Sequence, residues 1–317
     1  MTLNILNVTV DSDSDSLRLD IFISQTYSKI TRSAAQRLIK SGNILVNSEK
    51  AKRSQKVREG DSIELTPEVP IPLEAEAEDI PIDIIYEDDS IVVVNKAANM
   101  VVHPAAGNYT GTLVNALLHH IKDLSGISGV VRPGIVHRLD KGTSGVMIVA
   151  KNNDAHVSLT DQFKERSVTK KYLALIFGRM KEERGIIKSN IGRDKKNRKK
   201  ISSRGTNLKE ALTHFEVKKT FDRISLLELT PKTGRTHQLR VHLSETGHPI
   251  VGDELYGGTK RIKSIPDTQL RASLNGLERF LLHAAYLKIR HPKTGDEIEF
   301  SAPMPDDFSD TLKLLEG

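Results

Sequence analysis

Residues 134–151, GIVHRLDKGTSGVMIVAK, decide the fold. The second half, SGVMIVAK, is an apolar, β-branched run typical of a buried strand. The polar turn before it, HRLDKGTSG, holds Asp140 at the end of that strand, and Gly142 and Gly145 allow a tight turn or a close approach of backbone. Taken alone, these residues leave Asp140 open to two interpretations: a reactive carboxylate, or a turn residue that accepts backbone N–H bonds.

Strand patterns outnumber helical ones around this stretch. IVVVNK, KKYLALIFGR, ALTHFEVKK, ISLLELTP, AAYLKIR and DEIEFS are predicted strands, and GTLVNALLHHI and DAHVSLTDQFKE have helical spacing. The connections do not repeat a strand–helix alternation. The sequence therefore predicts an α+β domain with a mixed, mainly antiparallel sheet flanked by helices, rather than a doubly wound parallel sheet.

A second polar segment, residues 231–253, predicts a helix that presents an arginine. Thr236 is the expected cap, and the helix should end near Thr246, just before a glycine. Arg240 lies on the face opposite the apolar positions, so its direction is fixed. Such a guanidinium suits a carboxylate or a phosphate. The alternative is a surface arginine on an amphipathic helix.

The amino-terminal part reads as a separate basic module. Residues 16–66 contain ten Lys and Arg against five acids, and residues 67–90 contain nine acids and no Lys or Arg. Prolines at 70, 72 and 81 predict a linker, with the domain boundary within residues 67–82. Two helices with a basic face and the short strands NILVN and SIELT precede it.

This module resembles the S-four-type RNA-binding domain. The resemblance rests on RLDIFISQ, TRSAAQRLIKSGNILVN and VREGDSIEL. One rigid face that carries several cations suits a phosphate backbone. The alternative is a basic helical hairpin that packs on the rest of the protein.

Composition excludes several classes of protein. The 317 residues include 47 Lys and Arg against 41 Asp and Glu, a net charge of +6, and no cysteine or tryptophan. A disulfide scaffold, a thiolate nucleophile and a zinc knuckle are therefore excluded. No apolar run approaches the ~18–20 residues of a membrane span, and MTLNILNVTVDSDSDS lacks the features of a secretory signal, so a cytoplasmic protein is expected.

A third charged block supports nucleic acid as the partner. Residues 184–209 contain ten basic side chains and one acid, Asp194. Two basic blocks separated by an acidic segment favour a nucleic-acid binder, and lysine-rich loops that keep the protein soluble are the alternative. G-x-G-x-x-G, P-loop and H-E-x-x-H motifs are missing, so neither a cofactor nor a metal ion is expected.

Three motifs together resemble the pseudouridine synthases of the RluA/RluD type. They are HRLDKGTSG, KKYLAL, and TGRTHQLRVH followed by GHPIVGDELYGG, in family order within residues 80–300. VVHPAAGNYTGTLVNALLHH and the amino-terminal module are most similar to the RluD type. The resemblance implies an RNA-binding domain at 16–75 and a catalytic domain at 80–312. It also implies a monomer, without a cofactor or metal, that isomerises uridines of 23S ribosomal RNA in the helix 69 stem-loop.

The resemblance also implies roles for individual residues. Asp140 is the essential carboxylate, which either attacks C1′ of the uridine or removes its 2′ proton. Arg240 is its paired cation, and Tyr172 stacks on the target base. That base must leave its stack, and phosphate contacts can offset the cost. The RNA-binding candidates are Arg32, Arg37, Lys40, Lys52, Arg53, Arg138, Lys199, Arg204, Arg235 and His237.

One position departs from the family. Gly142 stands where the family usually has an acid, two residues after Asp140. Within the family reading, a sister synthase that modifies other ribosomal or transfer RNA uridines is the main alternative. A non-catalytic ribosome-assembly factor that binds ribosomal RNA is another. A metal-dependent hydrolase that uses Asp140 and His137 is a third, and it predicts sensitivity to chelators.

Overall fold

The computed structural model describes residues 5–27, 30, 32–52, 54–66, 75–104, 107–121, 124 and 134–317. The chain forms two compact units, Met1–Pro72 and Leu73–Gly317. No helix in the described ranges is long and apolar enough to span a membrane.

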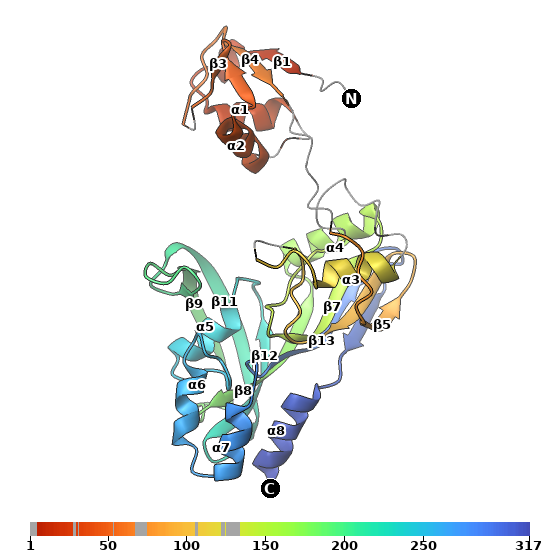
Figure 1. Ribbon diagram of the computed structural model, residues 1–317, viewed down its shortest axis with the longest axis vertical. Coiled ribbons are helices and arrows are strands. Elements are labelled where there is room, and N and C mark those ends of the chain that lie inside the picture. The colour runs from red at the N-terminus through yellow and green to blue at the C-terminus, as the bar shows by residue number, and fades with distance from the viewer. Residues whose placement is uncertain are drawn as a thin grey trace. The chain divides into compact units, whose positions relative to one another are not determined.

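The amino-terminal unit packs two helices on a small sheet, drawn in red to orange in Figure 1. Its apolar core includes Phe22 and Ile23 from the first helix and Leu38 and Ile39 from the second. The strand order is β1-β4-β2-β3, all antiparallel. The elements are β1 (Leu6–Thr9), η1 (Ser12–Ser14), α1 (Leu19–Thr26), α2 (Arg32–Ser41), β2 (Ile44–Val46), β3 (Glu49–Lys50) and β4 (Ser62–Leu65).

A buried carboxylate joins the two helices of this unit. Asp20, on α1, is 1% exposed and accepts hydrogen bonds from Arg18 Nε (2.9 Å), Arg32 Nε (2.9 Å) and Gln36 Nε2 (2.6 Å). Burial alone would raise the pKa of Asp20, but these hydrogen bonds outweigh it and hold the pKa well below 3.8. Asp20 therefore links α1 to α2 as an ionised group.

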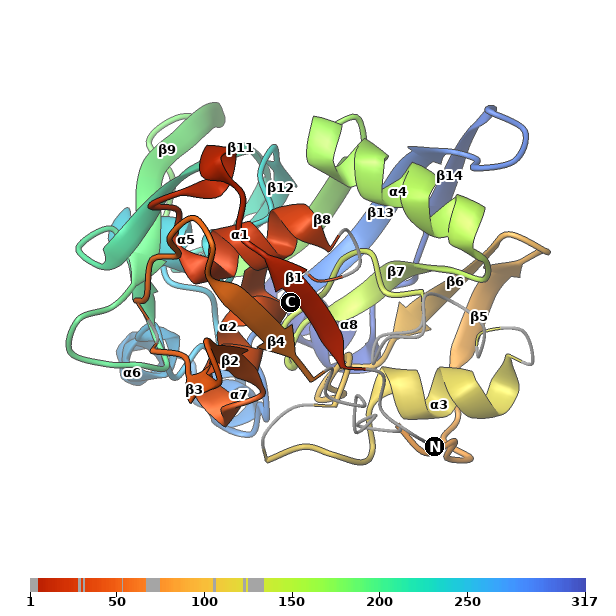
Figure 2. The same ribbon diagram turned by 90° about the horizontal axis from the view of Figure 1, so that it is seen from above.

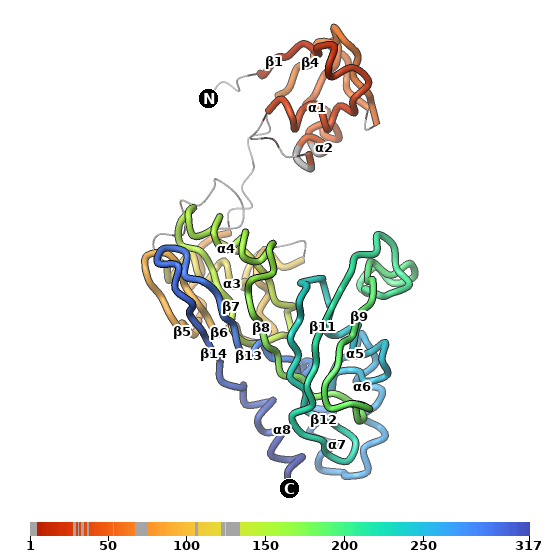
Figure 3. The backbone as a smooth tube through the Cα atoms, turned by 180° about the vertical axis from the view of Figure 1, so that it is seen from behind, coloured from red at the N-terminus to blue at the C-terminus, as the bar shows by residue number. Residues whose placement is uncertain are grey.

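The second unit is built on one long sheet, whose strands curve through Figures 1 and 3. The order is β10-β9-β11-β12-β8-β13-β7-β6-β5, and β14 also pairs with β13. Among the described strands only the β13/β7 pair is parallel, which confirms the predicted mixed, mainly antiparallel sheet. The strands are β5 (Asp83–Glu87), β6 (Ile91–Lys96), β7 (Ser144–Ala150), β8 (Thr169–Phe177), β9 (Arg184–Arg193), β10 (Ile201–Ser202), β11 (Thr206–Thr220), β12 (Ile224–Pro231), β13 (Leu282–Arg290) and β14 (Glu297–Ser301).

Helices cover both faces of this sheet. Along β6, Val92 and Val94 pack with α3, whereas Ile91 and Val93 pack with α4, so the two helices lie on opposite faces, as Figure 2 shows. Along β8, even-numbered residues pack with α5 and odd-numbered ones with α7 and α8. The helices are α3 (Leu113–His120), α4 (Asn153–Glu165), α5 (Gln238–Glu245), α6 (Gly258–Arg261), η3 (Ile262–Ser264), α7 (Thr268–Asn275) and α8 (Asp306–Glu316).

One segment differs from the sequence prediction. The predicted linker lies outside the described residues as far as 74. Beyond that it is held on the second unit, because Asn115 Nδ2 donates to the Glu76 carbonyl oxygen and the Gly111 N–H donates to the Glu78 carboxylate. The basic block 184–209 contributes β9, β10 and the start of β11, and five of its ten basic side chains lie in residues 194–200, which form the turn between β9 and β10.

Candidate active site

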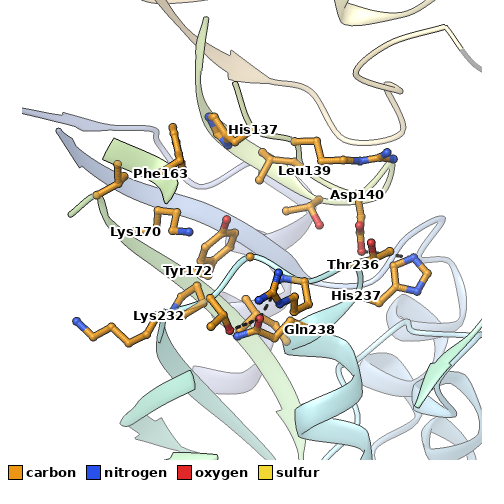
Figure 4. A pocket seen from close by; sticks show the side chains of 18 of the residues that line it. His137, Leu139, Asp140, Phe163, Lys170, Tyr172, Lys232, Thr236, His237 and Gln238 are labelled. Atoms are coloured by element: carbon orange, nitrogen blue, oxygen red, sulfur yellow. Dashed lines mark hydrogen bonds and ion pairs between the residues drawn. The ribbon is translucent and has the colours of Figure 1, made fainter. Parts of the chain in front are cut away.

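A cavity of about 490 Å³ opens on the sheet face that α5 covers. It is lined by residues 136–140 and 143, the end of α4, the start of β8, and residues 231–240 that lead into α5. Its volume is in the range of small-molecule sites. The three candidates Asp140, Arg240 and Tyr172 all line it, and Figure 4 shows Asp140 and Tyr172 on opposite sides of the space.

The turn that carries Asp140 is fixed by two buried cations. Lys96 Nζ, 1% exposed, donates to the carbonyl oxygens of Ala97 (2.7 Å), Met100 (2.9 Å) and Lys141 (3.3 Å). Arg279 Nη1 donates to the next carbonyl, that of Gly142, at 3.1 Å. The carbonyl oxygens of the two residues after Asp140 therefore both accept hydrogen bonds from buried side chains.

These two basic side chains have different surroundings. Burial, followed by the charge of Arg279, lowers the pKa of Lys96 to about 7. Arg279 is held by Asp307 of α8, with Nε–Oδ2 at 2.5 Å and Nη2–Oδ1 at 2.6 Å. The carboxyl-terminal helix thus anchors the Asp140 turn through Arg279.

Arg240 joins two carboxylates. Its Nη1 lies 3.2 Å from Asp140 Oδ2, while Nε and Nη2 bind Asp253 at 2.7 and 3.0 Å. Tyr256 and Phe280 also contact the guanidinium, with ring centroids 4.9 and 4.1 Å from Cζ. Asp253, 1% exposed, therefore fixes Arg240, and the third nitrogen is left for Asp140.

Sequence reasoning missed Asp253 and Phe280. Asp253 lies in the motif GHPIVGDELYGG, but no helical or strand period relates it to Arg240, 13 residues earlier. Phe280 is an apolar residue in a region without a predicted role. Only the motif could have indicated Asp253, and nothing local indicates Phe280.

The start of α5 differs from the prediction, which named Thr236 as the cap. His237 is the N-cap instead, with φ +54° and no side-chain capping bond. The left-handed backbone turns its ring so that Nε2 lies 3.8 Å from Asp140 Oδ2, and Nδ1 is 2.9 Å from the Tyr256 hydroxyl. Burial lowers the pKa of His237 and raises that of Tyr256 to about 12. The predicted end of the helix is confirmed at Thr246.

Tyr172 lies on β8 at the floor of the cavity. Its side chain packs with Ala174 and Leu229 on the α5 face of the sheet. Burial, and then the charge of Asp140, raises the pKa of Tyr172 above its ordinary value of 10. The phenol is therefore neutral at physiological pH.

In the structure, the His137 side chain is not placed with Asp140 as a metal ligand. His137 Nε2 accepts a hydrogen bond from the Ile148 N–H at 3.1 Å, and its ring stacks on Phe163 with centroids 4.7 Å apart. Burial lowers the pKa of His137 to about 3. Within the described ranges, no group of three or more His, Asp or Glu side chains could hold a metal ion.

The ten RNA-binding candidates fall into three groups. Arg138, Arg235 and His237 line the cavity. Lys199 and Arg204 are exposed near the tip of the β9–β11 hairpin. Those of the amino-terminal unit are Arg32, which binds Asp20, exposed Lys40 and Lys52, and Arg37 and Arg53, of which the Arg37 side chain and the whole of Arg53 lie outside the described residues.

Comparison with known proteins agrees with this geometry. The RNA pseudouridylate synthase family matches residues 90–245, and the S4 domain matches residues 17–63. The chain is 42% identical over 313 residues to the uncharacterized RNA pseudouridine synthase YlyB of Bacillus subtilis, covering 99% of each chain. The chain belongs to the RNA pseudouridine synthase family. It is therefore an isomerase that acts on RNA, as the sequence predicts.

Further relatives of this synthase agree. The chain is 41% identical over 305 residues to ribosomal large subunit pseudouridine synthase D of Vibrio parahaemolyticus, covering 96% of this chain and 92% of that one. The solved structure of human RNA pseudouridylate synthase domain containing 1 has a TM-score of 0.55 and 29% identity, over 76% of this chain and 97% of that one. The Vibrio relative and the human structure thus both agree with the fold and the family of this chain.

The structure explains the departure of this synthase at Gly142. A Cβ atom there would lie 2.9 Å from Cε1 of Phe280, the ring that packs on Arg240. The second glycine of the turn, Gly145, has φ +114°, and a Cβ would meet the Ala284 carbonyl oxygen at 2.2 Å. Gly145 is thus needed for the close approach of backbone, whereas a side chain at position 142 requires the Phe280 ring to shift.

Proposed function

We propose that this synthase isomerises uridines of 23S ribosomal RNA, with Asp140 as the essential carboxylate. One observation carries the proposal: Asp140, Arg240 and Tyr172 converge on a single cavity. The name of the Vibrio relative, ribosomal large subunit pseudouridine synthase D, supports ribosomal RNA as the substrate. The helix 69 stem-loop is the proposed target within that RNA.

In the proposed reaction, the N1–C1′ bond of the uridine breaks, the base turns, and C5 bonds to C1′. C5 then loses its proton and N1 gains one, so that the product is an isomer of the substrate. Arg240 donates a hydrogen bond to the Oδ2 atom of Asp140 and places a positive charge beside it. No described residue donates a hydrogen bond to Oδ1, which leaves that oxygen available to react at C1′ or at the 2′ proton.

Tyr172 has the second role in the proposal. Its ring is the stacking surface for the uracil, which must leave its place in the RNA. Stacking contributes ~1–3 kcal/mol for each base. That energy helps to offset the few kcal/mol needed to unstack the target.

The remaining charges are proposed to bind the RNA backbone. Residues 16–75 are the RNA-recognition domain and residues 80–312 the catalytic domain, with Arg138 and Arg235 at the cavity and Lys199 and Arg204 on the hairpin as phosphate contacts. The same proposal has the enzyme act as a monomer in the cytoplasm, without a cofactor or metal ion.

The test is tritium release from a 23S transcript labelled at C5 of uridine. The full-length protein should release tritium, and Asp140→Asn should release none while it binds the RNA nearly as tightly. Substantial turnover by Asp140→Asn would exclude this assignment.

A truncation tests the division of labour. Deleting residues 1–75 should weaken RNA binding and selectivity and leave turnover measurable. A truncated protein with full activity and unchanged selectivity would contradict the role of the amino-terminal domain.

A further inference from the structure

We propose that Lys170 binds a backbone phosphate of the RNA beside the nucleotide that enters the cavity. The inference rests on the proposed function, because it takes RNA as the ligand of the same cavity. It adds a substrate-binding residue that the motifs do not assign.

The position of Lys170 follows from its strand. Lys170 and Tyr172 are two residues apart on β8, so both side chains project from one face, with Cα atoms ~7 Å apart. Both line the cavity, and Figure 4 shows them side by side. Lys171 projects from the other face, where its Nζ lies 3.2 Å from a Glu228 carboxylate oxygen.

The sheet opens at this point. Strand β12 pairs with β8 only as far as Leu229 opposite Tyr172. Lys170, before that pair, hydrogen-bonds to β13 alone, opposite Leu287. The edge of β8 next to Lys170 therefore faces the cavity rather than a neighbouring strand.

Lys170 is a cation without an anion. Within the described residues its Nζ has no hydrogen bond or ion pair, and its one contact of this kind is with the Phe163 ring, 5.7 Å from the centroid. Burial lowers the pKa of Lys170. An anionic ligand would replace the lost hydration and stabilise the ammonium group.

The surroundings favour a phosphate as that ligand. Lys164 and Arg166, at the end of α4, line the same cavity and add positive charge. A base stacked on Tyr172 has its phosphates one ribose away, a separation comparable to the ~7 Å between the Cα atoms of Lys170 and Tyr172. A lysine ammonium is a compact charge that suits phosphate oxygens.

The first experiment compares steady-state kinetics of two neighbouring lysines. Lys170→Met should raise KM for the C5-tritiated 23S transcript about tenfold and change kcat by no more than about twofold, because a phosphate contact exists equally in the ground and transition states. Lys171→Met, the matched control, should change neither. Lys170→Arg, which keeps the charge, should recover most of the affinity.

The second experiment measures the salt dependence of RNA binding. Within an Asp140→Asn background, which does not turn the RNA over, Lys170→Met should lower the slope of log affinity against log KCl concentration by about 0.7–1. Lys171→Met should leave that slope unchanged.

Three results separate the possible failures. If Lys170→Met has the KM and salt slope of Lys171→Met, the inference is wrong and the proposed function stands. If kcat falls while KM and the slope are unchanged, Lys170 does not bind a phosphate. If the unsubstituted enzyme releases no tritium and the salt slope still falls with Lys170→Met, the phosphate site stands and the proposed reaction is wrong.

Discussion

Two carboxylates, one in each unit of the chain, bind arginine with opposite outcomes. Asp20 is 1% exposed and accepts hydrogen bonds from three side chains. Asp140 is 21% exposed, binds Arg240 through one oxygen and lines a cavity. Asp20, saturated by donors, joins two helices, whereas Asp140 keeps one oxygen without a described donor beside a cavity, where we propose that it reacts. Pairing with arginine alone therefore does not identify a catalytic group.

The largest expected effect is at the arginine of the second unit. Arg240→Ala should lower turnover at least about a hundredfold, because Asp140 loses its positive partner. It also leaves the buried Asp253 uncompensated, so the free energy of unfolding should fall by about 3 kcal/mol. Tritium release and urea denaturation measure the two effects.

Arg32→Ala is the matched control, since it removes one donor from Asp20. Turnover at saturating RNA should stay within about twofold. A large fall in kcat for this variant would mean that the two carboxylates do not differ as described.

The next effect concerns stability. Asp20→Asn should lower the stability of the amino-terminal unit by about 2 kcal/mol at pH 7, because three donors lose a charged acceptor. Its measure is hydrogen exchange of the α1 and α2 amides in the full-length protein. Turnover at saturating RNA should be unaffected.

The stability lost in Asp20→Asn should also depend on pH. The pKa of Asp20 is held well below its unfolded value of about 3.9, so its stabilisation is complete above that value and is lost as the pH falls toward the folded pKa. The difference between wild type and Asp20→Asn should be constant from pH 7 to 5 and shrink below pH 4. A difference that grows below pH 4 would contradict the assignment.

A smaller effect is expected at the stacking ring. Tyr172→Ala should weaken RNA binding about tenfold, within the stacking range of ~1–3 kcal/mol. Tyr172→Phe keeps the ring and should keep much of the binding. Filter binding with the 23S transcript measures both, and equal losses for the two variants would argue against stacking.

The smallest effect tests the packing behind Arg240. Gly142→Ala should cost about 1 kcal/mol of stability, because its Cβ meets the Phe280 ring. Gly234→Ala, at a glycine that lines the cavity and has open space around it, should change stability by less than about 0.5 kcal/mol. In a Phe280→Leu background, Gly142→Ala should cost less stability than it does in the wild-type protein. If the stability changes of the two substitutions simply add, the Phe280 ring is not what the new Cβ meets.

The sequence predicted what depends on local pattern. Strand patterns predicted β6, β7, β8 and β12, and the motifs singled out Asp140, Arg240 and Tyr172, which line one cavity. Strand β9 was missed because its alternation, RGIIKSNIGR, is carried by charged and polar residues. The cap at Thr236 was wrong because the chain enters α5 through a left-handed backbone at His237, a conformation that is uncommon in residues other than glycine.

Long-range partners were beyond prediction. Lys96 and Arg279 hold the turn after Asp140 from 45 and 137 residues away in the chain. No periodicity links such positions. They become visible only once the sheet brings β6 and β13 to either side of β7.

The most direct test of the central claim is a map of pseudouridines in 23S ribosomal RNA from cells with and without this gene. We expect one or a few sites, in the helix 69 stem-loop, to lose pseudouridine without the gene and to regain it with the wild-type chain or Asp20→Asn. Asp140→Asn should restore none of them. An unchanged map without the gene, or restoration by Asp140→Asn, would contradict the account.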